Sequence, residues 1–188
     1  MSIIAKDNRD PDWESIPTGT QQAVCAFVRD IGTQEGVYMG KPTRRHQCVI
    51  MWELARKRIK GEHEGMPFMI SKFYTLSLNE KANLCKDLES WRGKGFTDVE
   101  KQGFDIQVLE KVNCLLNIIE STKGDGKKII KVASISPLLP DMEKLLRTNL
   151  QPPAWVEEMV TRSVEWAESH GIEQEIADDT VPDDDMPF

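Results

Sequence analysis

Two hydrophobic periods follow one another along the chain, and their order is the strongest constraint on its fold. Apolar and polar residues alternate, as in half-buried β-strands, in five segments: residues 18–31, 44–54, 68–76, 112–119 and 128–135. Between the third and fourth segments the spacing changes, and Leu84, Leu88 and Trp91 share one face of a helix expected at 78–92. The sequence therefore predicts a mainly β domain with one internal helix.

Capping residues and glycines mark the ends of these elements. Residues 77–80 and 97–100 both fit capping boxes, in which a Ser or Thr and a Glu three positions later bond each other's backbone N–H. Gly93 can close the predicted helix by adopting a left-handed conformation. Glycines within 32–43 and 123–126 predict a loop or hairpin at each place.

Three strands, a helix and two strands form the layout of an OB fold, a five-stranded Greek-key barrel with a helix between strands 3 and 4. An SH3-like barrel would lack that helix, and an RRM would need two. We expect an N-terminal arm, an OB-fold domain, a C-terminal helical extension and a disordered acidic tail, at residues 1–17, 18–140, 141–170 and 171–188. In the extension we predict a short helix at 141–148 and an amphipathic helix at 154–169, which docks on the barrel or on a second subunit.

The cysteines and the ends of the chain indicate the compartment. Each of the four cysteines stands alone in an apolar run, without a CxxC pair, which predicts buried free thiols in a reducing environment: Cys25, Cys48, Cys85 and Cys114. The N-terminus has no signal-peptide pattern, and no apolar run approaches the ~18 residues of a membrane span. We expect a cytoplasmic protein, located in the bacterial host if it is encoded by a phage.

Catalytic and metal-binding patterns are missing from the sequence. It contains no Walker A, GxSxG or GxGxxG motif. His63 is a lone loop histidine, and Asp183–Asp185 resembles a metal site in composition only. We therefore expect a binding protein rather than an enzyme, with no cofactor and no metal.

Positive charge is concentrated in one stretch. Residues 171–188 hold seven acids and no bases, so the rest of the chain is neutral, with 24 Lys and Arg against 24 Asp and Glu. Within it, residues 41–60 hold seven bases and one acid, a local charge of +6. Because an oligonucleotide crosses strands 2 and 3 of an OB fold and is held by adjacent loops, this stretch predicts a groove that follows phosphates. The alternative is a solvated basic loop.

Binding of a single strand also requires aromatic faces on which bases stack. Tyr38 in the first loop and Phe73, on the more polar parity of the third strand, are the candidates. Trp52 and Tyr74 could stack bases or pack in the core. The predicted DNA-binding residues are Tyr38, Lys41, Arg44, Arg45, Arg56, Lys57, Arg58, Lys60, Lys72 and Phe73.

The C-terminal tip indicates a partner. An aromatic side chain beside its own α-carboxylate and three aspartates suits an apolar pocket ringed by Lys or Arg. The predicted partner-binding tip is Asp183, Asp184, Asp185, Met186, Pro187 and Phe188. The alternative is a solvated tail that ends on Phe by chance.

Two stretches of the sequence resemble known protein families. The segment FYTLSLNEKANLCKDLESWRGKGFT (73–97), with GFD (103–105) and ASISPL (133–138), resembles a family of phage and prophage proteins associated with single-stranded DNA binding through an OB fold. The match covers roughly residues 17–140, and its motif residues are structural. The tip DDDMPF resembles that of bacterial single-stranded DNA-binding proteins, with Met186 in place of a branched residue.

Two functions remain open at this point. The first is a phage-type protein that coats single-stranded DNA without sequence preference and recruits replication, recombination or repair enzymes through its tip. The second is an adaptor whose OB fold binds protein and whose tail mimics the host tip to capture or block its partners. Neither excludes a homo-oligomer.

Overall fold

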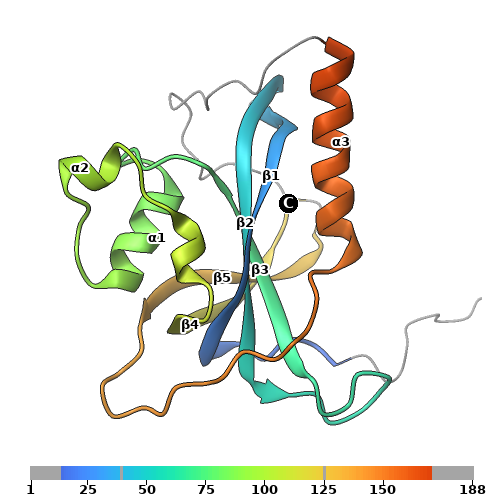
Figure 1. Ribbon diagram of the computed structural model, residues 1–188. Coiled ribbons are helices and arrows are strands. Elements are labelled where there is room, and N and C mark those ends of the chain that lie inside the picture. Colours follow the sequence, from blue (N-terminus) through green and yellow to red (C-terminus); the bar gives the residue numbers. More distant parts are fainter. Residues whose placement is uncertain (1–13, 39, 125, 171–188) are drawn as a thin grey trace, which may run out of the picture.

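The computed structural model describes residues 14–38, 40–124 and 126–170, which form one sheet with helices on both sides (Figure 1). Most of the predicted N-terminal arm, the acidic tail and the partner-binding tip lie outside these residues. The side chain of Tyr38 is also outside the description.

The sheet has five antiparallel strands in the order β3-β2-β1-β4-β5. The strands are β1 (Gly19–Tyr38), β2 (Lys41–Lys57), β3 (Pro67–Thr75), β4 (Asn113–Thr122) and β5 (Lys128–Pro137). β1 lies at the centre, because its first residues pair with β4 while residues 23–38 pair with β2. The predicted mainly β architecture, with a helix between the third and fourth strands, is confirmed.

Bulges bend the central strand. The register of β1 against β2 shifts between Cys25 and Phe27 and again between Asp30 and Gly32. At the first shift, Cys25 exchanges backbone hydrogen bonds with residues 111 and 112, at 2.8 and 2.9 Å. A bulge increases the local bend of a strand, and the bend lets one strand pair with two others that diverge.

Two apolar clusters lie on opposite faces of the sheet. The larger one is covered by α1 (Asn83–Arg92) and η1 (Ile106–Leu109), and it buries Leu84, Leu88 and Trp91 as predicted; the short α2 (Asp98–Lys101) between them has no buried residue. The Trp91 ring lies 5.9 Å from that of Trp52, and its Nε1 donates to the Asn113 carbonyl at 3.2 Å.

The smaller cluster lies on the opposite face, which we call the outer face. α3 (Ala154–His170) covers it, with Val156 fully buried beside Phe27, Val49 and Met51 (Figure 1). The predicted helix at 154–169 therefore exists and docks on its own sheet, chiefly on β1.

Two predictions at helix boundaries are wrong. The helix expected at 78–92 begins at Asn83 without a side-chain cap, because the Ser77 hydroxyl accepts from the Asn79 amide at 3.1 Å in a local turn. No helix forms at 141–148, whose backbone instead bonds the body of the domain: the Leu145 amide donates to Asn113 and the Thr148 amide to Glu53.

The other boundary predictions hold. The second capping box is formed between Thr97 and Glu100, and Gly93 closes α1 in a left-handed conformation with φ of 68°. The glycine-rich stretch 32–43 is a hairpin rather than a long loop, since β1 continues to Tyr38 and β2 starts at Lys41.

Replacement of Trp91 tests the larger cluster. Because its ring is only 3% exposed, Trp91→Ala should lower the free energy of unfolding by about 3–5 kcal/mol. Urea denaturation followed by circular dichroism measures the change. Leu146→Ala is the control, since Leu146 is 91% exposed and its loss should change stability by less than about 0.5 kcal/mol. Equal stability of the two variants would contradict the packing described here.

Candidate nucleic-acid interface

The predicted basic stretch divides into two groups at opposite ends of β2. Lys41, Arg44 and Arg45 form the hairpin group at its start, and the loop group follows residue 55. Fifteen residues separate Lys41 from Arg56 along the strand, which corresponds to roughly 50 Å at ~3.3 Å per residue. The loop group is Arg56, Lys57, Arg58 and Lys60.

In the hairpin group, each side chain has a different environment. Lys41 is exposed. Arg44 pairs with Glu35 at 3.4 Å, and its guanidinium lies 3.9 Å from the ring centroid of Trp166 on α3. Arg45 is only 3% exposed, so it does not belong to the exposed basic surface that the sequence predicted.

In the loop group, three side chains are exposed and one is packed. Arg56, Lys57 and Lys60 are exposed. Arg58 is half-buried, with its guanidinium 4.6 Å from the ring centroid of Phe68. The loop backbone is held by Glu14, whose carboxylate accepts from the Ile59 amide at 2.9 Å. This hydrogen bond fixes the loop backbone and holds the loop group beside the start of β3.

The two candidates on β3 lie on opposite faces of the sheet. Lys72 pairs with Asp87 of α1 at 2.7 Å, on the face of the larger cluster. Phe73 belongs to the smaller cluster, and its ring lies 5.7 Å from that of Trp155 on α3. Lys72 therefore does not contribute to a surface around Phe73, contrary to the prediction that grouped them.

Phe73 has a central position on the outer face. It pairs with Val49, which lies midway along β2 between the hairpin group and the loop group. Along β2, Phe73 therefore lies between the two basic groups, and within the loop group Arg58 packs on Phe68 of the larger cluster. Trp52 and Tyr74, the other aromatic candidates, are 0% and 1% exposed in the larger cluster and are core residues.

Two carboxylates that the sequence analysis missed, one buried and one partly buried, fasten the segment after β5 across the sheet. Glu53 is 2% exposed and accepts from the Thr148 amide and hydroxyl at 2.8 and 2.7 Å. Glu53 has the same parity along β2 as the apolar Val49 and Met51. This pattern could have identified it, because an acid among apolar residues on one strand face needs a hydrogen-bonding partner.

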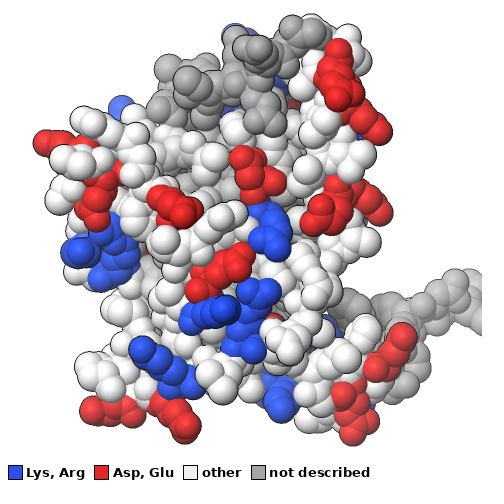
Figure 2. All heavy atoms as spheres, viewed as in Figure 1, with Lys and Arg blue, Asp and Glu red and all other residues white. Residues whose placement is uncertain are grey.

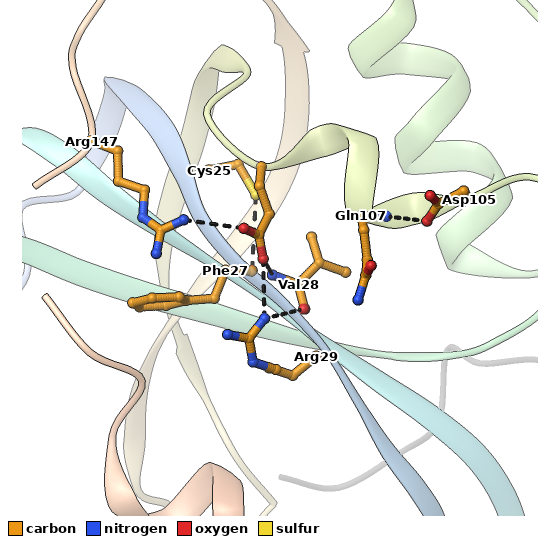
Figure 3. A network of polar contacts seen from close by, with 8 residues as sticks. Cys25, Phe27, Val28, Arg29, Asp105, Gln107 and Arg147 are labelled. Atoms are coloured by element: carbon orange, nitrogen blue, oxygen red, sulfur yellow. Dashed lines mark hydrogen bonds and ion pairs between the residues drawn. The ribbon is translucent and has the colours of Figure 1, made fainter. Parts of the chain in front are cut away.

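The second carboxylate, Glu110, joins three parts of the chain through partners that Figure 3 labels, Val28, Arg29 and Arg147. It accepts from the Val28 amide at 3.2 Å, from Arg29 at 3.1 Å and from Arg147 at 3.1 Å. The guanidinium of Arg147 also lies 4.6 Å from the ring centroid of Phe27. This network holds the C-terminal segment against the first bulge of β1, just before α3 begins.

Charges on the visible surface are mixed. Figure 2 shows Lys and Arg interspersed with Asp and Glu on this side, without a continuous basic stripe. In the described part of the chain, no three His, Cys, Asp or Glu side chains gather as metal ligands would. The four cysteines are buried free thiols, as predicted, and burial raises the pKa of Cys25 and of Cys114.

The chain matches no protein-family model, and no curated protein matches it. The resemblances described above therefore rest on the quoted motifs alone. No helix among the described residues is long and apolar enough to cross a membrane.

One ionisable pair joins β1 to β2 near the docking site of α3. His46 Nε2 lies 2.7 Å from Asp30 Oδ1, and this hydrogen bond raises the pKa of His46. Burial alone would raise the pKa of Asp30, but hydrogen bonds from His46 and from the Gly32 amide outweigh burial and lower it.

The pair makes stability depend on pH. The raised pKa of His46 means that its contribution is complete below about pH 6.5 and is lost as the pH rises through the raised value. The lowered pKa of Asp30 means that its contribution is present above about pH 4 and is lost as the pH falls through the lowered value. Urea unfolding at several pH values should therefore show the largest advantage of the wild type over His46→Gln between those limits. A difference that does not vary with pH would contradict this assignment.

Proposed function

We propose that this protein binds single-stranded DNA through an OB-type barrel. The observation that carries the proposal is the strand order β3-β2-β1-β4-β5, with α1 between β3 and β4. The pairings make β3 and β5 run in the same direction, and Cα atoms of the two strands approach within 8 Å. Closure of the sheet between these two edges would complete the Greek-key barrel of an OB fold.

The DNA strand would cross the outer face of β2 and β3. Phe73 offers an aromatic surface at the centre of that face, and the loop group and Lys41 offer phosphate contacts at its ends. The β4–β5 hairpin, a second binding loop in OB folds, adds Lys123 and Lys127, which the sequence analysis did not select. Recognition through stacking and phosphates would be tolerant of sequence.

The resemblance to phage single-stranded DNA-binding proteins supports a role in replication, recombination or repair. In that role the tip, Asp183–Phe188, recruits the enzymes that act on the coated strand. A side chain such as Phe188 contributes roughly 1.5–3 kcal/mol when buried, which suits an exchangeable contact.

A protein-binding adaptor is the second candidate. The mixed charges in Figure 2 and the burial of Arg45 favour it, because both reduce the exposed positive charge available to phosphates. A salt-dependent titration with oligo-dT separates the two functions, since an adaptor would not bind the oligonucleotide.

The salt dependence of oligo-dT binding tests the loop group. Removal of three positive side chains by Arg56→Ala, Lys57→Ala and Lys60→Ala should reduce the slope of log K against log salt by roughly 0.7 per lost phosphate contact, or about 2 in total. Fluorescence anisotropy of labelled oligo-dT at several salt concentrations measures this slope.

The matched control removes equal charge from the side of α1. Lys81, Lys86 and Lys94 are exposed there, and their replacement by Ala should leave the slope nearly unchanged. If the slope of log K against log salt fell by the same amount in both triple variants, the contribution of the loop group would be nonspecific. The proposed groove would then lie elsewhere.

A further inference from the structure

α3 contacts two of the residues that the sequence predicted to bind DNA. Its first turn places Trp155 5.7 Å from Phe73, the predicted stacking residue. Three turns later, Trp166 lies 3.9 Å below the guanidinium of Arg44, a predicted phosphate contact. Eleven residues of helix span roughly 16 Å, so the two indole rings are spaced along the outer face rather than gathered at one point.

The chemistry of α3 resembles that of a single strand. Its indole rings offer flat aromatic faces, as bases do, and its exposed acids are Glu157, Glu158, Glu165 and Glu168. Arg162 is the one Lys or Arg on this helix, so α3 carries net negative charge, while its buried residues, Val156 and Ser163, lie on the side that faces the sheet.

The contact between α3 and the sheet is shallow. Among its seventeen residues only Val156 and Ser163 are buried. Between the far half of the helix and β1 lies a crevice of about 350 Å³, lined by residues 33–35 with Arg162, Ser163 and Trp166. By contrast, the segment just before the helix is fixed by the buried Glu53 and by the Glu110 network.

We propose that α3 is an internal mimic of single-stranded DNA, which occupies the outer face in the free protein and is displaced when a strand binds. This inference rests on the proposed function and adds its regulation. Trp155 and Trp166 take the places of bases on Phe73 and Arg44, and the net negative charge of the helix matches that of a DNA strand. The fixed segment 145–148 keeps the displaced helix attached, so its competition with DNA is intramolecular.

The docked helix lowers the apparent affinity for DNA, because it must be displaced before a strand can bind. If only a small fraction of the molecules has α3 undocked, the dissociation constant for DNA is raised in inverse proportion to that fraction. A change that undocks α3 without altering the outer face should therefore tighten binding.

Gly32 supplies such a change. A Cβ at this position would lie 2.2 Å from Ser163 Oγ and 2.8 Å from Ser163 Cβ, so Gly32→Ala places a wedge between β1 and α3. Gly32 has a φ of 69°, and the substitution also strains the backbone. Gly19→Ala is the matched control, since Gly19 has a φ of 87° and nothing lies within 4 Å of a Cβ there.

The experiment is a titration of labelled oligo-dT with the full chain and four variants, each first checked for folding by thermal denaturation. Gly32→Ala should bind about tenfold more tightly if the wedge makes the undocked state ten times more populated, and Gly19→Ala should bind as the wild type does. Ser163→Gly removes both atoms that the wedge meets. The double variant should therefore bind as Ser163→Gly alone does.

Trp166→Ala gives a second, independent test, because it removes a contact of α3 at the far end of the helix. It too should bind more tightly. Unchanged or weaker binding by both Gly32→Ala and Trp166→Ala, while the wild type binds oligo-dT, would overturn the mimic and leave the proposed function standing. Failure of every protein, wild type included, to bind oligo-dT would overturn both.

Discussion

Both faces of β1 and β2 are apolar, and the rest of the structure depends on covering them. Along β2, residues 48–52 are consecutively buried, none more than 4% exposed, because alternate side chains enter the two clusters. A sheet of this kind needs a layer on each side. The insertion between β3 and β4 covers one face, and the chain after β5 crosses to cover the other (Figure 1).

The two layers are held with unequal strength. α1 buries two leucines and Trp91 in the larger cluster and is closed by Gly93, so it is an integral part of the domain. α3 buries only Val156 and Ser163, while the polar contacts that fix the C-terminal chain lie before it, at Leu145, Arg147 and Thr148. Because α3 buries few side chains, another ligand could replace it on the apolar, aromatic face beneath it. A single strand of DNA suits this face, since it supplies both stacked bases and phosphates.

Periodicity predicted the number and order of the elements, because strand and helix patterns differ clearly over ten residues. It could not predict the bulge at Cys25–Phe27, after which Ala26 and Phe27 both face the smaller cluster and simple alternation fails. Charge counting located the bases but not their environments: Arg45 is buried and Lys72 pairs with Asp87. These outcomes depend on contacts between segments far apart in the sequence, as does the cover that α3 places over Phe73.

Hydrogen–deuterium exchange with and without oligo-dT tests the central claim most directly, because it reports the outer face and its cover separately. The account predicts that saturating oligo-dT slows exchange of the backbone amides in residues 47–51 and 71–75 and speeds exchange in α3. The amides of α1 should be unaffected and serve as the internal reference. Slower or unchanged exchange in α3, with protection appearing on another surface, would contradict the account.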